Sequence, residues 1–130
     1  MATKISYRTV TLERPLPVPR ARAWTALVDA TSARTSGVDL GAPLGSVIEV
    51  VISDEPPWRR VARLDGDHPS ALVQTTFTIR DDGDRCLVAW SCLVDPTDVD
   101  PATLDTLVDV VADDGAAQLD RIVASACGSP

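Results

Sequence analysis

The longest regular pattern of apolar positions lies near the C-terminal end of the chain, over residues 100–128. Apolar side chains recur there at three- and four-residue steps while aspartates lie off the apolar stripe, which is typical of an amphipathic helix. The stripe consists of Leu104, Leu107, Val108, Val111, Gly115, Gln118, Leu119, Ile122 and Ala126. Asp100 can cap the start, Pro101 suits the first helical position, and Gly128 favours the end. Such a helix is about 38–40 Å long and needs another layer to pack against.

Five earlier stretches have the residue types and the alternation of β-strands. They are residues 6–16, 47–53, 58–65, 71–80 and 85–94. The turn-forming sequences Asp-Glu-Pro-Pro, Gly-Asp-His-Pro and Asp-Asp-Gly-Asp separate the last four of them. Because strands joined by tight turns pair side by side, we expect an antiparallel sheet.

The segment between the first two strands predicts two short helices. Residues 19–29 carry an apolar stripe made of Ala23, Trp24, Leu27 and Val28. A helical turn over residues 32–35 and a brief strand over 38–40 follow. The element order predicts one α+β domain over residues 1–130, in which a curved antiparallel sheet wraps around the long C-terminal helix.

Composition and charge exclude several function classes. The 130 residues are 45% hydrophobic and carry a net charge of −7, which argues against a nucleic-acid partner. The N-terminus does not resemble a signal peptide, and no apolar run is long enough for membrane insertion, so we expect a cytoplasmic protein. Three cysteines are an odd number, which indicates reduced thiols. With a single histidine and no phosphate-binding glycine loop, we expect neither a metal site nor another cofactor.

Four stretches together resemble a known superfamily. ERPLPVP at residues 13–19, followed by AWTALVD at 23–29, is similar to its first strand and helix. DEPPWRRVA at 54–62 resembles a strand entry, and DGDRCLVAW at 82–90 resembles the last hairpin. With the long helix, these motifs are similar to the START-like, birch-pollen-allergen-like (SRPBCC) superfamily and its helix-grip fold, closest to the polyketide cyclase/dehydrase group.

The sequence also departs from this superfamily at two points. The tryptophan that often follows the first helix is absent from residues 31–44, and the short segment before Val47 predicts a reduced or missing second strand. The resemblance implies a deep cavity between sheet and long helix that holds an apolar or aromatic small molecule. Members include polyketide aromatases and cyclases, lipid and hormone binders, and co-chaperone activators, and fold does not choose among them.

The expected cavity wall follows from strand alternation and the helix stripe. Val73, Thr75, Phe77 and Ile79 should face the helix, and the next strand should present Cys86, Val88, Trp90 and Cys92. Phe77 and Trp90 either pack as plain core or line an aromatic pocket. The residues expected to bind a ligand are Trp24, Trp58, Phe77, Ile79, Val88, Trp90, Val111 and Gly115.

Two polar residues are candidates for chemistry. In strand 58–65 either Val61, Arg63 and Asp65 point inward or Arg60, Ala62 and Leu64 do. Alignment on the family pattern places Arg63 inward, where its guanidinium would polarise substrate carbonyls. The alternative is a solvent-facing arginine. Gln118 lies either within the apolar stripe, where it could reach a ligand, or at its edge.

The nearby Gly115 costs about 1 kcal/mol of helix propensity, which suggests close sheet approach, a kink or room for a ligand. We interpret Asp113 and Asp114 as solvent-exposed surface residues and His68 as a turn residue.

Three functions remain open at this stage. The first is a cofactor-independent polyketide cyclase/dehydratase of secondary metabolism that uses Arg63 and Gln118. The second is a non-catalytic binder, such as a carrier or self-resistance protein, and the third is a protein-interaction module. Leu87, Ala89 and Leu93 would form an apolar outer face that favours a homodimer, unless the N-terminal segment covers it.

Overall fold

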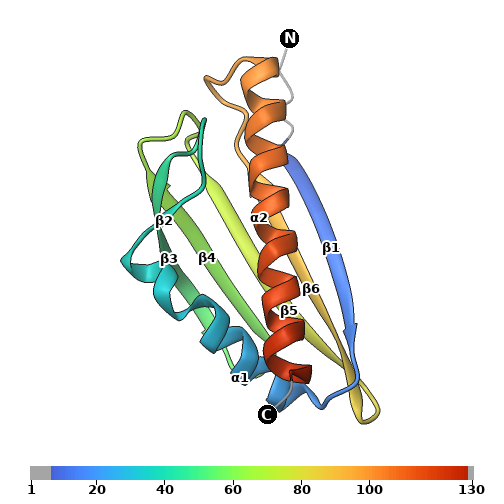
Figure 1. Cartoon of the computed structure of the whole chain (residues 1–130). Helices are drawn as coiled ribbons and strands as arrows, with labels where there is room; N and C mark the ends of the chain where they lie inside the picture. Colours follow the sequence, from blue (N-terminus) through green and yellow to red (C-terminus); the bar gives the residue numbers. More distant parts are fainter. Residues whose placement is uncertain (1–6, 129–130) are drawn as a thin grey trace.

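A six-stranded antiparallel sheet curves around one long helix (Figure 1). The computed structural model describes residues 7–128. Its elements are β1 (Arg8–Leu16), α1 (Arg20–Thr31), η1 (Ser32–Ser36), β2 (Val38–Asp39), β3 (Ser46–Glu55), β4 (Arg59–Gly66), β5 (Val73–Asp82), β6 (Arg85–Val94) and α2 (Pro101–Cys127). The strand order β1-β6-β5-β4-β3-β2 places the first strand beside the last. The predicted α+β helix-grip fold is confirmed, with β2 only two residues long.

The α2 helix is built as its sequence predicts. The Asp100 carboxylate accepts a hydrogen bond from the Thr103 backbone N–H at 3.1 Å, and Pro101 occupies the first turn. The buried positions are Leu104, Leu107, Val111, Gly115, Gln118, Leu119, Ile122 and Ala126. Within residues 7–128, no helix is both long enough and apolar enough to cross a membrane.

The register of β5 and β6 brings their inward residues face to face. Phe77 lies opposite Trp90 and Ile79 opposite Val88, and all four side chains are buried. Directly opposed residues in an antiparallel pair share a face of the sheet, so these rows point toward α2. The hairpin between the strands turns at Gly83, whose φ of 67° suits glycine.

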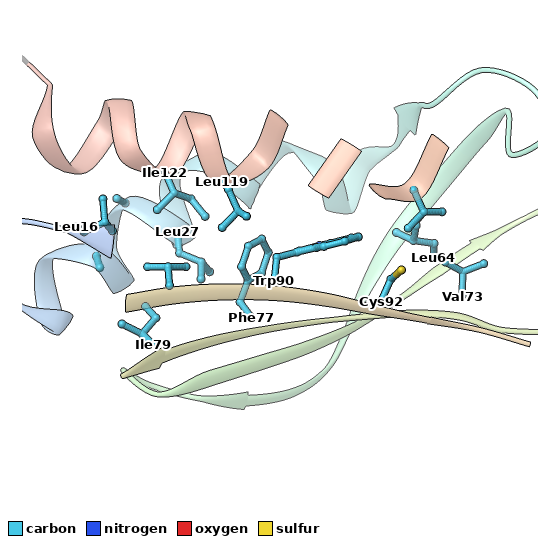
Figure 2. Packing of buried hydrophobic residues seen from close by; sticks show 14 of the residues in the cluster. Leu16, Leu27, Leu64, Val73, Phe77, Ile79, Trp90, Cys92, Leu119 and Ile122 are labelled. Carbon is cyan, nitrogen blue, oxygen red and sulfur yellow. The ribbon is translucent and has the colours of Figure 1, made fainter. Parts of the chain in front are cut away.

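The core lies between this concave face, α1 and α2. Figure 2 shows Leu119 and Ile122 of α2 above Phe77 and Ile79, with Leu27 of α1 between the helix and the sheet. Since α1 packs against both α2 and the sheet, the two helices together cover one end of the concave face.

The β3 strand exposes large apolar side chains on its outer face and buries an acid on its inner face. Val47 and Glu49 point inward and are buried, whereas Ile48 and Ile52 are exposed near the sheet edge that β2 leaves uncovered. The outer residues of β6 are half-buried, and β1 lies beside β6 within the sheet rather than across its outer face. The N-terminal residues 1–6 fall outside the described range, so their predicted cover is not addressed, and the homodimer stays a prediction.

Candidate functional site

The space between the sheet and α2 is occupied by large side chains. Trp90 is 0% exposed, and its ring lies directly against Gly115 (Figure 2 shows the ring between helix and sheet). A Cβ built at Gly115 would come within 2.5 Å of the Trp90 ring carbons. Of the three explanations that the sequence allowed for Gly115, close approach of helix and sheet is the one observed.

A buried polar cluster joins η1, β3 and α2 beside this packing. We call it the Arg34 cluster, and its members are Arg34, Glu49, Asp114 and Gln118. Arg34 Nε donates to Glu49 Oε2 at 2.6 Å, while its Nη2 and Nη1 donate to the two Asp114 oxygens at 2.6 and 3.2 Å. Gln118 Nε2 donates to Asp114 Oδ2 at 3.0 Å. Arg34 and Glu49 are each 4% exposed, so this cluster is part of the interior.

The cluster contains more carboxylates than cations. One guanidinium faces two carboxylates, which gives a formal charge of −1. Burial by itself would lower the pKa of Arg34, but the hydrogen bonds that Arg34 donates to Asp114 and Glu49 outweigh it and raise that pKa above its usual value. Arg34 is therefore charged at every physiological pH and holds η1 against the sheet and α2.

Five buried side-chain atoms lack a hydrogen-bond partner within the described residues, and three of them belong to Arg20 and His68. The other two are Gln118 Oε1, on a residue that is 1% exposed, and the Trp90 indole Nε1. The Gln118 amide cannot flip to pair this oxygen elsewhere, because the flip would set an oxygen against the Asp114 carboxylate. An acceptor and a donor are thus left without partners in the interior.

Most of the predicted ligand-binding residues do share this interior. The buried ones come from β5, β6 and α2: Phe77, Ile79, Val88, Trp90, Val111 and Gly115. Gln118, predicted for chemistry, is buried on α2 as well. Trp24 packs at the edge of the core, with the Arg60 guanidinium carbon 5.3 Å from its ring centre. Trp58 is 53% exposed and carries the Arg20 guanidinium over its ring, so its expected place in the pocket is wrong.

Of the two orientations that the sequence left open for Arg63, the structure shows the outward one and not the inward one implied by the family pattern. Arg63 lies opposite Gln74 in the row that points away from α2, and Leu64 and Ala62 take the inward places in β4. Its Nε and Nη2 donate to the two Asp65 oxygens at 2.6 and 3.0 Å, with 43% of the side chain exposed. The hydrogen bond with Asp65 raises the pKa of Arg63. Arg63 therefore takes no part in the interior.

Three members of the Arg34 cluster were not among the predicted site residues. Glu49 carried a usable signal, because an acid in phase with Val47 interrupts an apolar strand. Asp114, interpreted as surface, precedes Gln118 by one helical turn, so the two side chains meet. Arg34 carried no signal, since only the placement of η1 brings it to β3.

Within residues 7–128, Trp90 is fully buried and its ring occupies the place where the family resemblance implies a deep pocket. A shallow depression of about 290 Å³ lies between the β2–β3 loop and the start of α2, at Pro43 and Thr106. Another of about 520 Å³ lies at the sheet edge, beside Asp39 and Asp67. In residues 7–128, no three His, Cys, Asp or Glu side chains gather as metal ligands would.

Comparison with known proteins finds similar three-dimensional structures but no similar sequence. No protein-family model matches the sequence, and no curated protein does. Norcoclaurine synthase of Thalictrum flavum, solved with a transition-state analogue, is 11% identical, with 97% of this chain and 98% of that one covered at a TM-score of 0.75. The Zhui aromatase/cyclase of Streptomyces sp. R1128 is 13% identical, with 93% and 94% covered at 0.73. Ara h 8.0201 is 12% identical, with 95% and 100% covered at 0.73.

These matches span nearly the whole chain at low identity, so the likeness is one of fold. The strand order, the curved sheet and the long final helix agree with it. The chain has the helix-grip fold, as its sequence motifs predicted.

Proposed function

We propose that this protein binds an apolar or aromatic small molecule between the sheet and α2, next to Trp90 and Gln118. The observation that carries the proposal is the pair of buried atoms without partners, Gln118 Oε1 and Trp90 Nε1. Each such atom costs about 1–3 kcal/mol in a closed core. Phenylalanine in place of Trp90 would avoid that cost, while Gln118 offsets part of its own cost through the hydrogen bond from Nε2 to Asp114.

Binding requires the interior to open, because Trp90 and its neighbours now fill it. The depression at Pro43 and Thr106 is the suggested entrance, where the β2–β3 loop meets the first turns of α2. Gly41 and Gly45 flank this loop with φ values of 77° and 64°, and neither has a neighbour that a side chain would touch. A ligand would select the open arrangement and stabilise it by its differential affinity.

Of the two small-molecule functions, we propose the non-catalytic one, a carrier or self-resistance protein. Arg63, the residue expected to polarise carbonyl groups, lies on the outer face. The Nε and both Nη atoms of Arg34 are engaged by carboxylates, which leaves its guanidinium committed to the fold. The Gln118 amide can orient a ligand but cannot exchange protons as an acid or base would.

The three indole N–H signals of the protein make the binding test direct. Titration with 2-naphthol, followed by ¹H–¹⁵N correlation spectra, should shift the Trp90 indole signal with saturation and leave that of Trp58 in place. Trp90→Phe and Trp58→Phe assign the two signals. If the Trp90 signal stays fixed up to the solubility limit of the probe, or if only the exposed Trp58 responds, the proposed site is wrong.

A further inference from the structure

We infer that the ligand of this site carries a protonated amine on its apolar frame, an inference that rests on the proposed function. Three features of the Arg34 cluster point to it: an open acceptor, an excess of carboxylate and a fixed amide orientation. All three features arise where η1, β3 and α2 meet.

The open group on the cluster side is an acceptor. Gln118 Oε1 can only accept, and Asp114 holds it in place by engaging the amide nitrogen. A ligand that meets this oxygen must therefore bring an N–H or O–H. A carboxylate or a simple ketone brings only further acceptors and would leave the Gln118 oxygen unpaired.

The charge count separates an amine from a hydroxyl group. Arg8, Arg14, Arg20 and Arg60 each pair with one aspartate, so those contacts are balanced. In the Arg34 cluster, one guanidinium faces both Glu49 and Asp114. Both carboxylates are withdrawn from water, so the excess negative charge is weakly screened. A cation beside Gln118 would compensate it, whereas a hydroxyl group would not.

The second buried atom without a partner, on Trp90, indicates what the rest of the ligand carries. The Trp90 indole N–H is a donor without a partner, and Trp90 belongs to the same buried apolar cluster as Phe77 and Leu119. An aromatic frame with one acceptor, such as a hydroxyl oxygen, would pack there and pair this N–H. The fitting class is thus an aromatic amine that also carries an oxygen acceptor.

Three probes with the same aromatic frame test the inference. They are 1-naphthylmethylamine, 1-naphthalenemethanol and 1-naphthoate, compared by calorimetry and by the Trp90 indole signal at neutral pH. The amine should bind about tenfold more tightly than the alcohol, and the carboxylate should bind most weakly. A carboxylate that binds as tightly as the amine would overturn the inference.

Substitutions in the Arg34 cluster test which residues cause the preference for the amine. Gln118→Leu should reduce the affinity for amine and alcohol by about tenfold each, and Gln74→Leu, the same change on the outer face of β5, should alter neither. Asp114→Asn should reduce the difference in affinity between the amine and the alcohol. Because that change weakens the hold on Arg34, Glu49→Gln provides a second removal of one charge, and thermal melts verify folding.

The outcomes separate the two proposals. If none of the three probes binds, the proposed function and the inference fail together. If all three bind with equal affinity, or if the amine preference survives the charge-removing variants in folded protein, the function stands and the inference alone fails.

Discussion

Gly115 and Trp90 form a close contact between α2 and the sheet. The Trp90 ring takes the volume that a side chain at position 115 would need, so the pair acts as one packing unit. The glycine weakens the helix locally by about 1 kcal/mol relative to alanine. Its missing side chain leaves room for a fully buried tryptophan between the two layers.

At this scale we predict that Gly115→Ala lowers the free energy of unfolding. Alanine gains about 1 kcal/mol of helix propensity, but the new methyl group overpacks against Trp90 at a cost of about 1–3 kcal/mol. Urea unfolding measures the net change, and near-UV circular dichroism reports the displaced indole.

The propensity contribution can be measured separately on the same helix. Ala124 is exposed on α2, so Ala124→Gly should lose about 1 kcal/mol with no change in the near-UV spectrum. A Gly115→Ala protein as stable as the wild type would show that Trp90 has room to retreat, and would contradict the close packing described above.

Among the elements, α2 depends most clearly on its own sequence. Its start is set by the Asp100 carboxylate, which accepts the Thr103 N–H, and its buried positions follow the apolar stripe. The hydrogen bond from Thr103 lowers the pKa of Asp100 below its ordinary value of 3.8. The charged form of this residue is therefore the one that stabilises the folded helix.

We expect Asp100→Ala to lower the melting temperature at neutral pH and to have little effect in acid. A carboxyl group whose pKa is lower in the folded state adds stability above its unfolded pKa and loses it as the pH falls through the folded pKa. Melts from about pH 7 down to about pH 2 should show the difference between wild type and variant closing below pH 4.

Asp109→Ala is the matched control, because it removes the same charge from an exposed site of the same helix. It should shift the melting temperature far less at neutral pH. A gap between wild type and Asp100→Ala that persists unchanged in acid would mean that the carboxylate charge is not what caps α2.

In the whole molecule, the curved sheet and α2 separate the cysteines into two environments. Cys86 and Cys92 lie in the inward row of β6 and are buried, while Cys127 is exposed at the end of α2. Burial raises the pKa of the Cys86 and Cys92 thiols, which disfavours the reactive thiolate. The reactivity of the Cys86 and Cys92 thiols therefore reports whether the interior between the sheet and α2 is closed to solvent.

Native protein should react with Ellman's reagent at one thiol within minutes, and all three thiols should react in denaturant. Cys127→Ser should remove the fast reaction and leave the two slow ones. Fast labelling of Cys92 in the native state would contradict the closed interior, because it would place solvent between β6 and α2.

The sequence by itself determined the elements, their order and the inward rows of β5, β6 and α2. These depend on short-range periods of two and 3.6 residues, and Phe77, Trp90 and Leu119 lie where those periods place them. The pattern also placed Gln118 on the buried stripe and identified Gly115 as unusual, so part of the candidate site was visible from local spacing.

The tertiary structure decided the rest. The phase of β4 was ambiguous because arginines alternate with apolar residues on both faces, and only pairing with β5 turned Leu64 inward and Arg63 outward. The Arg34 cluster joins residues 15 and 80 positions apart, so no local pattern contains it. Whether the interior is open or filled depends on how side-chain volumes meet across layers, as Trp90 does with Gly115, and that is a property of packing rather than of periodicity.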